Sequence, residues 1–158
     1  MKRFPTTFLQ IIIGLISIAT LIGLIWEPLT EGRNTSSTLF EVYFNDPFLA
    51  FAYFAFISVF VGYYNAFKIL GYIRENKEFS EPALKALQMI KKCAWFFIGC
   101  VIFAECLLFL FQSGQEDIAG GVAIGLILFV GAIVTATFTD VLESIFRNGI
   151  HLKQKNTK

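Results

Sequence analysis

The chain has 158 residues, of which 56% are hydrophobic and only 16% are charged. Soluble domains carry about 25% charged residues, so this composition excludes an ordinary water-soluble domain and points to lipid as the solvent. The formal net charge is +1, and the basic residues flank the apolar segments as topology signals do, so we expect no nucleic-acid binding.

Four segments are long and apolar enough to cross a bilayer as helices. A hydrocarbon core of about 30 Å takes about 20 helical residues. The chain offers such segments at about residues 8–26, 47–70, 93–112 and 118–141. We therefore predict an all-α membrane protein, one domain (1–158) with four transmembrane helices in an antiparallel bundle. The first segment is longer than a signal-peptide core, so we expect it to be retained, with cleavage as the alternative.

The basic residues are distributed asymmetrically along the chain. Twelve of the 13 precede the first segment, lie at the inner end of the second or between the second and third, or follow the fourth; the exception is Arg33. Because basic loops stay in the cytoplasm, both termini are predicted to be inside. This topology gives an outer loop at 27–46, a cytoplasmic loop at 71–92 and a cytoplasmic tail at 147–158.

The cytoplasmic loop contains a predicted helix start. Ser80 is a natural N-cap, Glu81 suits the positive helix end, and Pro82 is tolerated in the first turn. No helix breaker follows, so we predict one continuous helix from Glu81 to Gln112 that extends the third span into the cytoplasm. Three lysines are expected to face water or lipid phosphates: Lys85, Lys91 and Lys92. An interfacial helix is favoured over a partner-docking surface.

The same loop carries a resemblance. The stretch IRENKEFSEPALKALQMIKK, from Ile73 to Lys92, together with four spans in a chain of this length, resembles a bacterial family of small four-span integral membrane proteins catalogued only as a domain of unknown function. The resemblance implies the bacterial cytoplasmic (inner) membrane and genes that often neighbour small helix-turn-helix regulators. It carries over no catalytic residues. The chain departs from the family's acidic, apolar tail, since it ends in GIHLKQKNTK.

One acid interrupts the third apolar segment: Glu105 stands in CVIFAECLLFLF, residues 100–111. An ionised carboxylate in lipid costs about 2.5–3.5 kcal/mol on insertion scales, so a neutral acid that donates a hydrogen bond is the cheaper state. Counted inward from the outer helix ends, Thr20 and Tyr53 reach a similar depth, and Gly125 leaves room beside them. We predict a contact among Glu105, Tyr53 and Thr20.

Two interpretations of Glu105 stay open. Intramembrane acids often mark a transport path, and small four-span exporters use such a residue for proton coupling. The alternative is an acid that only joins helices through a hydrogen bond, worth about 0.6 kcal/mol. We favour the second, because the sequence offers no other acid or base at that depth.

A second polar set lies near the predicted inner ends of the second and fourth spans. Its members are Asn65, Lys68 and Asp140, with tyrosines and threonines beside them. Lys68 and Asp140 are similar in depth, which predicts an interfacial ion pair. Anchoring at the interface and helix–helix hydrogen bonds are the favoured role for this set.

No residue pattern indicates catalysis, a metal or a cofactor. His151 is the only histidine, and the three cysteines share one predicted helix. We therefore predict a non-enzymatic accessory or regulatory membrane protein, which contacts the lipid bilayer and either a second copy or a protein partner through its cytoplasmic hairpin. The alternative is a small proton-coupled transporter that uses Glu105.

Overall fold

The computed structural model describes residues 3–30, 47–112 and 118–155, and this part of the chain is entirely helical with connecting turns. Its helices are α1 (Arg3–Thr30), α3 (Pro47–Arg74), α4 (Glu81–Gln112) and α5 (Ile118–Lys155). Each is long and apolar enough to cross a membrane, which confirms the predicted all-α class with four candidate spans. The bounds of α4 are those predicted from the sequence. Most of the predicted outer loop, residues 31–46, lies outside the described residues.

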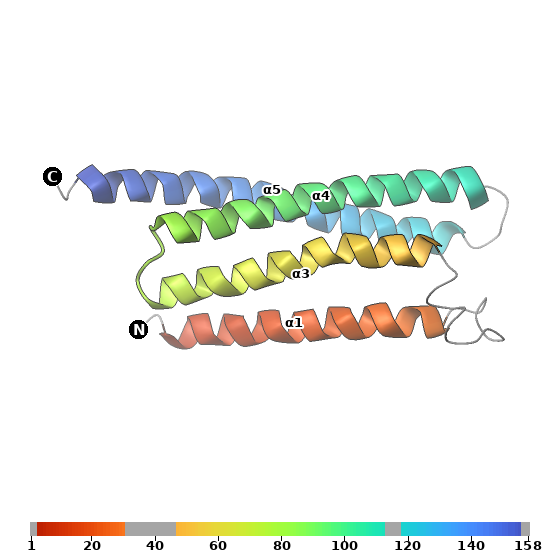
Figure 1. The fold of residues 1–158 in the computed structure, drawn as a ribbon, viewed down its shortest axis with the longest axis horizontal. Coiled ribbons are helices and arrows are strands. Elements are labelled where there is room, and N and C mark those ends of the chain that lie inside the picture. The colour runs from red at the N-terminus through yellow and green to blue at the C-terminus, as the bar shows by residue number, and fades with distance from the viewer. Residues whose placement is uncertain (1–2, 31–46, 113–117, 156–158) are drawn as a thin grey trace.

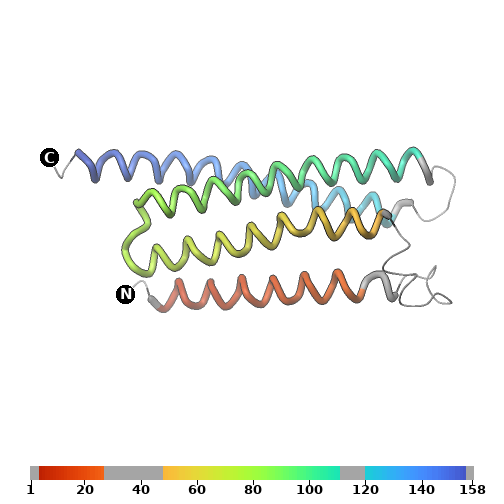
Figure 2. The backbone as a smooth tube through the Cα atoms, in the orientation of Figure 1, coloured from red at the N-terminus to blue at the C-terminus, as the bar shows by residue number. Residues whose placement is uncertain are grey.

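The helices pack in chain order. The main contacts join α1 to α3, α3 to α4 and α4 to α5. Figure 1 shows α1, α3 and α4 running side by side, with α5 against α4. The tube in Figure 2 shows that α1 begins, and α5 finishes, at the end of the molecule that carries the turn between α3 and α4. We call this end, defined by residues 75–80, the loop end.

Polar side chains join α1 to α3. The buried Gln10 amide donates to the Phe67 carbonyl at 3.2 Å, and the Tyr53 hydroxyl donates to the Leu24 carbonyl at 3.0 Å. Thr20 lies 3.4 Å from the Tyr63 hydroxyl, oxygen to oxygen. Since lipid offers no hydrophobic drive between helices, such polar contacts and close packing hold them together.

Aromatic rings and small residues join the other helices. Three ring pairs bridge α3 and α4: Phe51–Phe103, Phe54–Phe96 and Phe56–Phe97. Between α4 and α5, the small buried residues Ala94, Ala132 and Ala136 let the backbones approach closely. These contacts form the middle core of the molecule.

The turn after α3 is closed by a Schellman motif. The Lys77 amide donates to the Tyr72 carbonyl at 2.8 Å, and the Asn76 amide donates to the Ile73 carbonyl at 3.1 Å. Asn76 has a φ of 56°, the left-handed conformation that this motif requires. Asparagine is among the few residues besides glycine that tolerate it. The turn then leads to Ser80, at the predicted N-cap of α4, whose carbonyl accepts from the Leu84 amide.

Asn76→Val is expected to lower the free energy of unfolding by about 1–2 kcal/mol, because a β-branched side chain is strained at positive φ. Asn76→Gly should match the wild type within a few tenths of a kcal/mol. Reversible unfolding of the full chain in mixed micelles measures both. Equal damage from glycine and valine would show that the left-handed conformation is not the constraint at this position.

Candidate functional site

The loop end has its own apolar core, formed by three helices. We call it the loop-end core, and its buried members are Ile69, Ala83, Leu84, Ala86, Leu87 and Phe146. Leu87 is only 2% exposed and is the largest fully buried side chain among the described residues. The first turns of α4 are therefore packed between α3 and α5. They do not form a solitary helix on the membrane surface.

The turn between α3 and α4 is fastened to α5 by an aromatic contact. The Phe79 ring lies 5.9 Å from the Phe146 ring, centroid to centroid, in an edge-on arrangement. The same ring occupies the space where a Cβ on Gly149 would lie, with Cγ of Phe79 only 2.8 Å from that point. Because Gly149 has no side chain, the Phe79 ring packs directly against α5 there, which holds the turn against this helix.

Gly149→Ala is expected to displace the Phe79 ring and lower the free energy of unfolding by about 1–3 kcal/mol, the usual cost of overpacking. Gly131→Ala is the matched control, because that glycine on the same helix has open space around it. Thermal unfolding in detergent compares the two. A Gly149 variant as stable as the Gly131 variant would show that the Phe79 ring does not need the space that Gly149 leaves.

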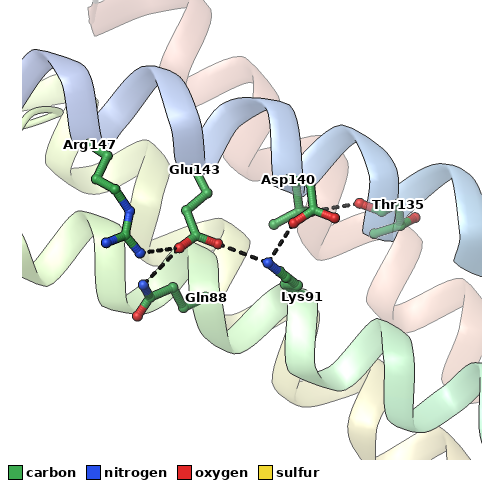
Figure 3. A network of polar contacts seen from close by, with 7 residues as sticks. Gln88, Lys91, Thr135, Asp140, Glu143 and Arg147 are labelled. Carbon is green, nitrogen blue, oxygen red and sulfur yellow. Dashed lines mark hydrogen bonds and ion pairs between the residues drawn. The ribbon is translucent and has the colours of Figure 1, made fainter.

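Beside this core, five side chains of α4 and α5 form a polar network (Figure 3). We call it the loop-end network: Gln88, Lys91, Asp140, Glu143 and Arg147. The Glu143 carboxylate accepts from Arg147 at 2.6 Å, from Gln88 at 3.0 Å and from Lys91 at 3.2 Å. The Lys91 ammonium also contacts Asp140 at 2.5 Å. Glu143 is therefore the centre of the network.

The network is electrically balanced, with two cations and two carboxylates. Its centre is buried and its margins are open: the side chain of Glu143 is 11% exposed, that of Lys91 33% and that of Arg147 61%. A buried carboxylate is tolerable only when it is paired and hydrogen-bonded, and Glu143 is both. Chemically, this arrangement locks α4 to α5, and it leaves neither acid of the network without a cationic partner.

The predicted ion pair between Lys68 and Asp140 is wrong. Asp140 pairs with Lys91, while the Lys68 ammonium lies over the Tyr64 ring at 5.4 Å from its centroid. Asn65 donates to the Val61 carbonyl of its own helix at 2.8 Å. The physical reason is the order of packing: α4 lies between α3 and α5, so its own lysine reaches Asp140 first.

The prediction for the three lysines of α4 is correct for two of them. Lys85 and Lys92 are exposed, whereas Lys91 is engaged by Asp140 and Glu143. The sequence contained a signal for the network that we missed. Gln88 and Lys91 are three residues apart, as are Asp140 and Glu143, so each pair shares one helix face.

The predicted contact of Glu105 with Tyr53 and Thr20 is also wrong. Tyr53 and Thr20 bond within the α1–α3 pair, and α1 packs mainly on α3, so it does not bring Thr20 to α4. The expected room at Gly125 is confirmed: a Cβ there would overlap the Glu105 carboxyl group. Glu105 thus faces α5 instead of α1.

The fold and this site define a class: a four-helix membrane protein whose helices are joined by a polar network and a separate apolar core at one end. The chain belongs to the family DUF2975, described as a protein of unknown function, whose model matches residues 7–157. It is 32% identical over 158 residues to the uncharacterized membrane protein YoaS of Bacillus subtilis (strain 168), covering 99% of this chain and 98% of that relative. No solved structure matches the chain.

Proposed function

We propose that this protein is a non-enzymatic accessory or regulatory component of the bacterial cytoplasmic membrane, with both termini inside, and that its loop end docks a protein partner. The observation that carries this proposal is the loop-end core together with its network, because a mere connection between two spans would need neither. A rigid surface outside the spans suits binding, since little ordering is required when the partner arrives.

The position of the loop end suggests where a partner would meet it. Exposed apolar side chains on α1 continue down to Phe4, which is 84% exposed, and α1 begins level with the α3–α4 turn (Figure 1). The loop end would therefore lie at the inner membrane surface, and the last residues of α5 would project beyond it. Lys85 and Lys92 are exposed there, which favours a partner with an acidic surface.

Purification of the full chain from native membranes in a gentle detergent tests this proposal. We expect a partner at one copy per chain, and we expect Lys85→Glu combined with Lys92→Glu to reduce its recovery at least tenfold. Lys85→Arg combined with Lys92→Arg is the matched control, because it keeps both positive charges at the same exposed positions. Repeated purifications without a stoichiometric partner would contradict the proposal.

A second candidate function is proton-coupled transport through Glu105. It is favoured by one observation: among the described residues, no donor is hydrogen-bonded to this carboxyl, so no side chain there stabilises it as a structural carboxylate. An acid that is kept in lipid without such a bond is more readily explained by a ligand. If Glu105→Gln left proton-driven export unchanged, this function would be excluded.

A further inference from the structure

The Glu105 carboxyl lies directly on the backbone of α5. A Cβ added to Gly125 would stand 2.7 Å from the Cδ atom of Glu105, closer than real Cβ contacts allow. One turn away, Gly121 seats Leu108 at an ordinary 3.5 Å. The two glycines thus contact Glu105 and Leu108, which lie about one turn apart on α4, and of these two side chains only Leu108 is apolar. The carboxyl group is held in the contact between α4 and α5.

The polar groups predicted to serve this carboxyl are engaged elsewhere. The Tyr53 hydroxyl donates to the Leu24 carbonyl, and the Thr20 hydroxyl donates to the Ile16 carbonyl at 2.8 Å. Within residues 48–110 and 120–155, no side chain donates to Glu105. A polar group in an apolar setting without a partner is costly. The fold therefore positions an acid and supplies it with no side-chain donor in these residues.

The surroundings of the carboxyl are apolar and partly open. One turn to either side on α4, Ile102 is 49% exposed and Phe109 is 58% exposed. The titratable groups nearest in sequence or register are Cys106 on α4 and Tyr53 on α3, and α5 has none between residues 120 and 139. The rim of the site thus faces hydrocarbon, with one acid and an aromatic ring beside it.

We propose that Glu105, seated on Gly125, binds a lipophilic organic monocation that enters from the bilayer. One carboxylate balances one positive charge, the apolar rim accepts an apolar body, and the face of Phe109 attracts a cation. A hard metal ion would need several oxygen ligands, which this site does not have. The empty site holds a proton on the carboxyl, and the arriving cation releases it, so charge is exchanged one for one. This inference rests on the second proposed function and names its substrate class.

Binding of tetraphenylphosphonium to the full chain in phosphatidylcholine nanodiscs tests the inference. We expect one saturable site per chain, release of one proton per cation bound, and affinity that rises up to about tenfold per pH unit while the carboxyl is protonated. Glu105→Gln should weaken binding at least tenfold, while Asp140→Asn, in the loop-end network, should bind as the wild type does. Gly125→Ala should also weaken binding at least tenfold, because it displaces a carboxyl that is still present. Gly131→Ala, at an open position of the same helix, should not.

The outcomes separate the site from the function. A wild type without saturable binding, binding that ignores pH, or full binding by Glu105→Gln would overturn the inference. Thermal unfolding of each variant identifies any loss caused by misfolding, and the near-isosteric Glu105→Gln keeps the test valid if Gly125→Ala does not fold. If export depended on Glu105 but the chain did not bind phosphonium, proton-coupled transport would stand and the lipophilic cation as its ligand would be wrong. If the chain bound phosphonium but did not export it, the ligand class would stand and the transport function would be wrong.

Discussion

Replacing Leu87 by alanine is expected to lower the free energy of unfolding by about 2–5 kcal/mol, the range for a large side chain removed from a packed core. Leu87 is 2% exposed and lies at the centre of the loop-end core, between α3 and α5. The cavity would also loosen the contact between the three helix ends. Reversible unfolding of the full chain in mixed micelles measures the change.

Leu152→Ala is the matched control for this prediction. Leu152 is the same residue type at the same end of the molecule, but it is 64% exposed. We expect a change within about 0.5 kcal/mol, as for surface substitutions in general. If the two alanine variants were equally stable, the loop end would not be a packed core.

Replacing Glu143 by alanine is expected to cost about 2 kcal/mol, because hydrogen bonds to a charged group are worth more than neutral ones. The substitution removes the acceptor shared by Gln88, Lys91 and Arg147. The full penalty of a broken buried pair should not appear, because Arg147 is open to solvent and Lys91 keeps Asp140. The stability of the full chain in mixed micelles again measures the loss.

Asp140→Ala separates the two carboxylates of the network. The side chain of Asp140 is 49% exposed and, among the described residues, pairs only with Lys91, so its removal should cost less than about 1 kcal/mol. High salt should reduce this small contribution further, because exposed pairs are screened. If Asp140→Ala lost more stability than Glu143→Ala, Glu143 would not be the centre of the network.

The helices could be predicted from the sequence because lipid makes a simple demand. A helix needs about 20 apolar residues to cross, and four such segments stand out. The start of α4 was equally clear, since Ser80, Glu81 and Pro82 each suit a helix N-terminus and no breaker follows before Gln112. These are local signals, and local signals are preserved when the chain folds.

The partners of the polar residues could not be predicted in the same way. Lys68 and Asp140 are similar in depth, but depth does not say that α4 stands between their helices. The predicted contact between Thr20 and Glu105 is wrong for the same reason, since α1 packs mainly on α3. The order in which helices pack is a tertiary property. The spacing within each helix, by contrast, could have revealed which polar residues share a face.

The most direct test of the loop-end core is hydrogen exchange in the full chain, comparing wild type with Leu87→Ala. We expect slow exchange of the amides in residues 69–73, 83–90 and 142–150 of the wild type. We expect the single substitution on α4 to speed exchange in all three segments together, because they share one core. Faster exchange confined to α4, or wild-type segments that exchange independently of one another, would contradict a folded unit at this end of the molecule.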